Sequence, residues 1–331
     1  MTTIQQGVDP YTIEGAHHRY IEVGGVQLSV YEAGQPDAPA VVFSHGFPEL
    51  AYSWRHQLPA LAAAGFHAIA PDQRGYGGTD RPSSIEDFDI LHLTGDLVGV
   101  LDELGIERAV FVGHDWGGMI VWQMPFLHRD RVAGVVGVNT PHFPRLPVRP
   151  IEMFRTAAGD NFYIVWFQTP EIPDAALAEN VDVVLDRMLR RGVEPSGLRE
   201  RAMSSNSTMA EAIVNAPDEL LGPRLLSEDE LAVYVDTFRA TGFTGGINWY
   251  RNFDRNWELT ADQTSARIDG IPCLMVTAEW DPVLAPAMAS GMPELIDDLE
   301  THEIAKCGHW TQQEHPDELN HILVDWLTRK L

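Results

Sequence analysis

Hydrophobic and polar positions follow two different periods along the chain. Short β-branched and apolar runs of strand length predict buried strands at residues 26–32, 40–44, 67–71, 109–113, 132–139, 273–277 and 300–304. Between these runs, apolar residues recur every three or four positions, which predicts amphipathic helices; an example is Ile90, Leu93, Leu97, Leu101 and Leu104. Apolar strands alternating with helices are typical of an α/β fold, a mostly parallel central sheet with helices on both faces.

The alternation stops between about residues 141 and 268. This stretch contains helical patterns, at 180–191 and 227–240, but no convincing strand. We therefore expect an all-helical insertion between two strands of the sheet. The predicted core domain comprises residues 1–141 and 266–331, and the predicted helical cap comprises residues 142–265.

Composition narrows the class of partner. The 331 residues are 44% hydrophobic and 21% charged, as in ordinary soluble globular proteins, but the net charge is −25. A surface this negative repels phosphate backbones and anionic lipid, so we expect no nucleic-acid or membrane partner and a small neutral or apolar substrate.

The apolar runs are too short to span a membrane, and residues 1–22 lack a secretory signal, which favours a cytoplasmic protein. Monomer and homodimer are both compatible with the sequence.

The two cysteines, Cys273 and Cys307, lie far apart in sequence within apolar segments. We expect two free buried thiols, as in a cytosolic enzyme. A disulfide is the alternative, because the two segments could form neighbouring strands.

The most informative motif is Gly113-His114-Asp115-Trp116-Gly117, which follows a predicted strand and opens a helix. It resembles the nucleophile elbow of α/β-hydrolases, with an aspartate where a serine usually stands. A carboxylate suits displacement at a saturated carbon, because the resulting ester can be hydrolysed, whereas a serine would leave an ether. The N–H groups of the helix beginning at Trp116 are expected to keep Asp115 ionised. The alternative is that Asp115 only caps this helix.

His309 is the candidate base. It follows the predicted strand at 300–304, and in α/β-hydrolases the order along the chain is nucleophile, acid, histidine. Asp281, just beyond the predicted strand at 273–277, is the candidate acid that orients the imidazole. Glu279, two residues earlier, is the rival, but Asp281 stands farther into the loop region where side chains reach a site.

The run His45-Gly46-Phe47-Pro48 follows the predicted strand at 40–44 and matches the loop that usually supplies an oxyanion donor. We assign the donors to the backbone N–H groups of Phe47 and Trp116, whose side chains are also expected to line the substrate pocket. No cofactor or metal is expected, because the chain has no His-Glu-x-x-His motif and no dinucleotide-type glycine spacing.

Taken together, five motifs resemble those of soluble epoxide hydrolases of the α/β-hydrolase superfamily. The resemblance runs from about Val26 to the carboxyl terminus and is greatest to bacterial members that lack an extra amino-terminal phosphatase domain. The motifs are His45-Gly46-Phe47-Pro48-Glu49, Asp72-Gln73-Arg74-Gly75-Tyr76-Gly77, Gly113-His114-Asp115-Trp116-Gly117, Asn248-Trp249-Tyr250-Arg251-Asn252 and Gly308-His309-Trp310-Thr311-Gln312.

The resemblance implies an activity and two further residues. Members of this family convert an epoxide and water to a vicinal diol through an ester on the aspartate, and two cap tyrosines hold and protonate the epoxide oxygen. By resemblance these tyrosines fall on Tyr163 and Tyr250. The implied reaction is attack by Asp115 on a ring carbon, followed by hydrolysis of the hydroxyalkyl ester by water that His309 and Asp281 activate.

Two other functions share parts of this pattern. A haloalkane or haloacid dehalogenase would use the same aspartate, with the Trp116 indole binding halide and the tyrosines serving only in packing. A non-catalytic ligand receptor on the same fold would keep the pocket, but it would not need the whole set of catalytic groups that is present here.

Overall fold

A computed structural model describes residues 4–194, 207–218 and 221–331. Its described part contains one sheet of eight strands, with a two-stranded sheet of β1 (Ile4–Gln5) and β6 (Arg81–Pro82) beside it. The strand order of the large sheet is β10 (Leu299–Ile304), β9 (Cys273–Ala278), β8 (Val132–Val138), β7 (Ala109–His114), β4 (Ala40–Ser44), β5 (His67–Pro71), β3 (Val26–Ala33) and β2 (His17–Val23). The strands pair in parallel from β10 to β5, and β3 and β2 continue the sheet antiparallel.

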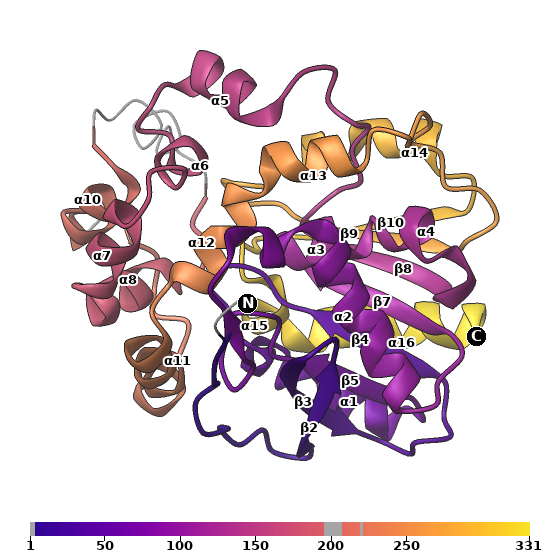
Figure 1. Ribbon diagram of the computed structural model, residues 1–331. Helices are drawn as coiled ribbons and strands as arrows, with labels where there is room; N and C mark the ends of the chain where they lie inside the picture. Colours follow the sequence, from indigo (N-terminus) through magenta and orange to yellow (C-terminus); the bar gives the residue numbers. More distant parts are fainter. Residues whose placement is uncertain (1–3, 195–206, 219–220) are drawn as a thin grey trace.

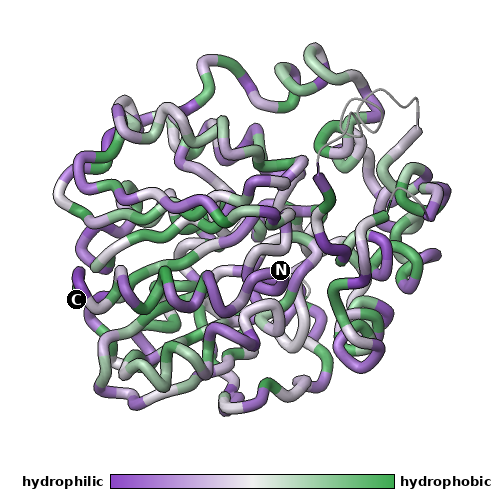
Figure 2. The backbone as a smooth tube through the Cα atoms, turned by 180° about the vertical axis from the view of Figure 1, so that it is seen from behind, coloured by the Kyte–Doolittle hydropathy of each residue, from purple (hydrophilic) through white to green (hydrophobic). Residues whose placement is uncertain are grey.

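Helices cover both faces of this sheet, as Figure 1 shows. On one face, α2 (Ile90–Glu103) and α3 (Trp116–Val121) contribute to a buried cluster with strand residues such as Val42 and Phe111. On the other face, α1 (Gln57–Ala63) and α16 (Pro316–Lys330) pack on Val41 and Val110. Neighbouring strand residues thus point to opposite faces, and each face of the sheet belongs to a buried apolar cluster. Figure 2 shows hydrophobic residues, in green, along several strands of the sheet. The predicted α/β fold class is confirmed.

Between β8 and β9 the described chain is helical. Figure 1 shows most of these helices gathered to one side of the sheet. They are α5 (Pro150–Ala158), α6 (Tyr163–Trp166), α7 (Ile172–Ala178), α8 (Val181–Met188), α10 (Met209–Val214), α11 (Glu228–Thr241), α12 (Thr244–Arg251) and α13 (Phe253–Leu259). The predicted cap, 142–265, includes residues 195–206 and 219–220, which lie outside the described residues; its boundaries stay a prediction.

Shorter elements complete the described chain. They are η1 (Ala51–Trp54), η2 (Ile85–Phe88), α4 (Met124–Leu127), η3 (Arg129–Arg131), η5 (Pro286–Gly291), α14 (Met292–Leu295) and α15 (Thr311–Glu314). Both cysteines are free and buried, as the sequence predicted. Across the described residues, no helix combines the length and apolar character needed to cross a membrane.

Candidate active site

Asp115 occupies a sharp turn between β7 and α3. Its φ angle is +52°, in the left-handed region that a non-glycine residue rarely adopts. The turn brings backbone segments into direct contact: a Cβ atom built on Gly117 would lie 1.9 Å from the carbonyl oxygen of Ser44. Glycine at position 117 is therefore a steric requirement, and the strained turn presents the Asp115 side chain beyond the end of the sheet.

Backbone amides hold the Asp115 carboxylate. The Phe47 N–H donates to Asp115 Oδ1 at 2.8 Å, and the Trp116 N–H donates to the same carboxylate. Asp115 occupies the N-cap position of α3, but its side chain makes no capping bond to the helix beyond Trp116. Burial raises the pKa of Asp115, and His309, His114 and the two amides oppose that rise. The amide at the helix start thus favours the ionised form, as expected from sequence, and it acts together with His309, His114 and the Phe47 amide.

His309 lies between two carboxylates. Its Nδ1 atom is 2.9 Å from Asp281 Oδ2, and its Nε2 atom is 3.8 Å from Asp115 Oδ2, beyond hydrogen-bonding distance. The rival acid Glu279 is exposed and accepts a bond from the Lys306 N–H instead. The structure therefore places Asp281, and not Glu279, against the imidazole.

The pKa values of Asp281 and His309 shift in opposite directions. Burial alone would raise the pKa of Asp281, but His309, the Leu284 amide and Asn139 outweigh it and hold that pKa well below its usual range. Burial alone would lower the pKa of His309, but Asp281, Asp115 and Glu49 raise it to about 9. At neutral pH, with both Asp115 and Asp281 ionised, His309 is an imidazolium.

The two predicted tyrosines lie together on neighbouring helices. The rings of Tyr163, at the start of α6, and Tyr250, in α12, have centroids 5.7 Å apart. Gln168 joins the two helices by donating to the carbonyl oxygens of Ile164 and Tyr250. Burial raises the pKa of both phenols, and the nearby Asp115 charge raises it further, so both stay protonated at neutral pH.

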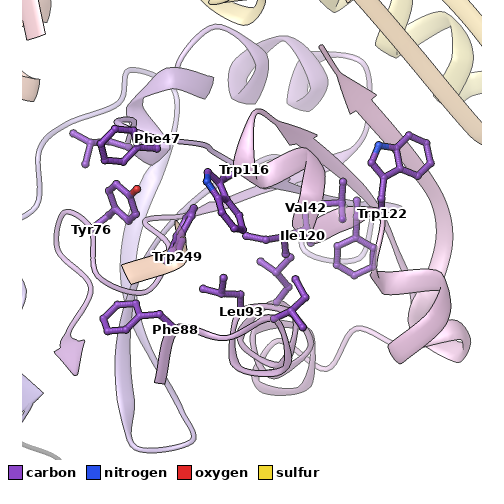
Figure 3. Packing of buried hydrophobic residues seen from close by; sticks show 14 of the residues in the cluster. Val42, Phe47, Tyr76, Phe88, Leu93, Trp116, Ile120, Trp122 and Trp249 are labelled. Carbon is purple, nitrogen blue, oxygen red and sulfur yellow. The ribbon is translucent and has the colours of Figure 1, made fainter. Parts of the chain in front are cut away.

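Aromatic side chains surround the carboxylate. The Phe47 and Trp116 rings lie 5.4 Å and 5.1 Å from the Tyr250 ring, centroid to centroid. Figure 3 shows Trp116 beside Trp249, with Phe47 and Tyr76 nearby. The Tyr250 ring thus lies among aromatic side chains, which suits a neutral ligand with apolar substituents.

A buried polar network beneath the site was not assigned a role from sequence. His114 Nδ1 lies 2.6 Å from Glu49 Oε1, and His114 Nε2 lies 2.7 Å from the backbone oxygen of His309. Gln312 donates to the other oxygen of Glu49 at 2.7 Å. Through these two contacts His114 connects the elbow to the backbone of the base, His309. Glu49, His114 and Gln312 each fall inside a motif noted above, which was the available signal.

Two more polar residues were not assigned a role from sequence: Thr311 lies inside the last of the five motifs, whereas Asn139 lies in none of them. Asn139, one residue beyond β8, donates from Nδ2 to Asp281 Oδ2 at 2.7 Å. Thr311 donates from its hydroxyl to Asn139 Oδ1 at 2.7 Å. In the described part of the chain, no group of three or more histidine, cysteine or carboxylate side chains is arranged to hold a metal ion.

Comparison with known proteins adds to this geometry. The model of the α/β-hydrolase fold family matches residues 39–316. The chain is 48% identical to epoxide hydrolase A of Mycobacterium tuberculosis over 94% of its own length and 97% of that protein. It is 41% identical to bifunctional epoxide hydrolase 2 of Sus scrofa over 94% of its own length, and there it spans 55% of the relative.

Solved structures of epoxide hydrolases are also similar to this chain. The crystal structure of epoxide hydrolase A from Mycobacterium thermoresistibile superposes with a TM-score of 0.88 at 43% identity, covering 95% of this chain and 98% of that one. An epoxide hydrolase from Vigna radiata superposes with a TM-score of 0.83 at 33% identity, covering 96% of this chain and 99% of that one.

Proposed function

The chain belongs to the α/β-hydrolase family and, within it, to the epoxide hydrolases; on this premise we propose that Asp115 opens the epoxide and that His309 directs hydrolysis of the resulting ester. The overall reaction is epoxide plus water to vicinal diol. The observation that carries the residue roles is the position of the His309 imidazole between the carboxylates of Asp115 and Asp281.

In the first step, Asp115 Oδ2 attacks a ring carbon and the carbon–oxygen bond of the epoxide breaks. Oδ1 is the oxygen that accepts from the Phe47 amide, which leaves Oδ2 as the nucleophile. The leaving oxygen stays in the product as an alkoxide and takes a proton from Tyr163 or Tyr250. Because burial keeps both phenols protonated, each can supply that proton.

Ester formation also prepares the base. Forming the ester removes the negative charge of Asp115, one of the charges that raise the pKa of His309. The imidazolium therefore becomes a stronger acid at this point and returns a proton to the tyrosinate. His309 is then neutral, as a general base must be.

In the second step, His309 Nε2 removes a proton from water, and the hydroxide attacks the carbonyl carbon of the Asp115 ester. The negative charge develops on Oδ1, which accepts from the Phe47 amide, and the Trp116 amide donates to the same carboxyl group. Collapse breaks the bond between the carbonyl carbon and Oδ2, which leaves as an oxygen of the diol. The diol leaves with the remaining acid proton, so Asp115 ends as a carboxylate and His309 as an imidazolium.

A dehalogenase would use the same elbow, but the relatives reported above are named epoxide hydrolases and the two tyrosines lie together beside the nucleophile. We further propose a small neutral or apolar epoxide as substrate, since the residues around Tyr250 are aromatic.

The test of this function is the variant His309→Gln. Removal of the base should leave ring opening intact and stop ester hydrolysis, so intact-protein mass spectrometry should find enzyme plus one substrate after mixing with styrene oxide. His321→Gln, at an exposed histidine on α16, serves as the matched control and should turn over without an adduct. Unmodified His309→Gln with no burst of epoxide loss would refute the two-step reaction.

A further inference from the structure

A chain of buried hydrogen bonds reaches the Asp281 carboxylate at the oxygen that also faces His309. The Cys307 thiol lies 3.4 Å from the Thr311 hydroxyl, which is 2.7 Å from Asn139 Oδ1. Asn139 Nδ2 is 2.7 Å from Asp281 Oδ2, the same oxygen that faces His309 Nδ1. Cys307, Thr311, Asn139 and Asp281 are each at most 3% exposed, so water does not compete for these bonds.

The bonds can run in only one direction. Ionised Asp281 only accepts, so the Asn139 amide must turn its NH₂ group towards it. That orientation leaves Asn139 Oδ1 facing Thr311, which must therefore donate its single hydroxyl hydrogen. Thr311 can still accept from the Cys307 thiol. Each group in the chain is satisfied, and the orientation of the Asn139 amide is fixed at both ends.

The backbone conformation of Asn139 also fixes its position beside Asp281. It adopts φ +64°, a left-handed conformation that asparagine tolerates better than most residues. Its N–H donates to the Val276 carbonyl at 2.8 Å, which continues the β8–β9 pairing by one residue. The conformation alone does not require a side-chain partner. Here, however, the side-chain amide donates to Asp281 and accepts from Thr311.

We propose that Asn139 and Thr311 are positioning residues for the proposed base: they hold Asp281 Oδ2 in place and share its negative charge, so that His309 can give up its proton in the ester intermediate. This inference rests on the proposed function. Asp281 Oδ1 is held separately by the amides of Val283 and Leu284, so the carboxylate stays anchored when the Asn139 bond is removed.

Because Asp281 stays anchored, removal of the Asn139 bond should change the pKa of His309 in a definite direction. Without the Asn139 donor, more negative charge remains on Asp281 Oδ2, and the His309 imidazolium is stabilised. The other ionisable groups that face His309 are Asp115 on the elbow and Glu49 with His114 beneath it, and they are unchanged. Ester hydrolysis then needs a higher pH to reach its full rate.

The experiment measures ester hydrolysis against pH by rapid quench and intact-protein mass spectrometry, with styrene oxide as substrate. The variants are Asn139→Gly, which tolerates the positive φ, and Thr311→Val, which removes the hydroxyl at nearly constant volume. Thr311→Ser is the conservative rescue. Thr237→Val is the matched control, because the Thr237 hydroxyl is also buried but bonds within α11.

We expect the rising limb of the hydrolysis rate to move to higher pH in Asn139→Gly, by about one unit, so that hydrolysis is about ten-fold slower below the limb and nearly normal above it. Thr311→Val should move it in the same direction by less, and Thr311→Ser and Thr237→Val should keep the wild-type limb. Ring opening should be little changed throughout.

The positioning role would be overturned if the hydrolysis rate fell by the same factor at every pH, or if the rising limb stayed unmoved in both Asn139→Gly and Thr311→Val. Either result would leave the proposed function intact. A wild-type enzyme that forms no ester at all would instead refute the proposed function.

Discussion

His309 is protonated or neutral according to the charge on Asp115. In the free enzyme both Asp281 and Asp115 raise the pKa of His309 to about 9, even though burial acts against them. The proposed reaction needs a protonated His309 while the epoxide opens and a neutral one while the ester is hydrolysed. We propose that ester formation, which neutralises Asp115, favours this change because it removes one of the charges that raise the pKa of His309.

The variant Asp115→Asn imitates the neutral ester, and asparagine tolerates the positive φ of this position. We expect the pKa of His309 to fall below 9 in this variant, because the imidazolium loses a nearby negative charge, and to fall further in Asp281→Asn, which also removes the hydrogen bond to Nδ1. NMR titration of the imidazole measures both shifts. Asp130→Asn, at an exposed carboxylate in η3, should leave the pKa unchanged; an unchanged pKa in Asp115→Asn would contradict this mechanism.

Residues that stand in a local motif could be predicted from sequence, and residues that act through distant partners could not. Asp115 and His309 are recognisable because glycines and a defined order along the chain surround them. Asn139 meets Asp281 and Thr311 across 142 and 172 positions of sequence. A single polar residue after a strand carries no sign of which distant side chains it will reach.

At the level of elements, the elbow depends on the close approach of β7, α3 and β4. Gly117→Ala would force a Cβ atom against the Ser44 carbonyl. We expect a loss of about 1–3 kcal/mol in the free energy of unfolding, as for other overpacked sites, together with slower ring opening because the Trp116 amide shifts. Urea unfolding and the rate of ester formation measure the two effects.

Gly95→Ala is the matched control for this substitution. Gly95 lies within α2, and an added Cβ meets no atom within 4 Å. Alanine should stabilise this helix, by roughly 0.5–1 kcal/mol, because it restricts the unfolded chain and favours helix. Equal stability of Gly117→Ala and wild type would show that the elbow tolerates a wider approach.

Strand prediction succeeded for the central strands and for the edge strand β10, and it missed the other edge strand, β2. The central strands β4 and β7 are buried at every position and form continuous apolar runs. The edge strand β2 has the sequence HHRYIEV and buries only Ile21, so hydrophobicity gives it no strand pattern. Its place is set by its antiparallel pairing with β3, a long-range interaction that periodicity does not report.

On the scale of the whole molecule, the parallel sheet assembles the site. Asp115, Asp281, His309 and Phe47 each follow the carboxyl end of a different strand, β7, β9, β10 and β4. Parallel strands bring these ends to one edge of the sheet, and the helices between β8 and β9 supply both tyrosines. The order of the elements was predictable from sequence. The packing of the helices between β8 and β9 was not.

The net charge of −25 also acts on the scale of the whole molecule. Its field should slow the approach of an anionic epoxide, such as a phenylglycidate, and leave styrene oxide unaffected. We expect kcat/KM for the anion to rise with ionic strength as the field is screened, and kcat/KM for the neutral epoxide to change little. Equal salt dependence for the two substrates would show that surface charge does not select substrate.

The most direct test of the account is a single turnover in oxygen-18 water with the enzyme in excess over epoxide. If Asp115 attacks the epoxide, the diol receives an enzyme oxygen, and the peptide that contains Asp115 gains the heavy oxygen. Mass spectrometry of the peptide and of the diol shows which of the two carries the heavy oxygen. Heavy oxygen in the first diol and none on Asp115 would mean that water attacks the epoxide directly, and the covalent mechanism would be wrong.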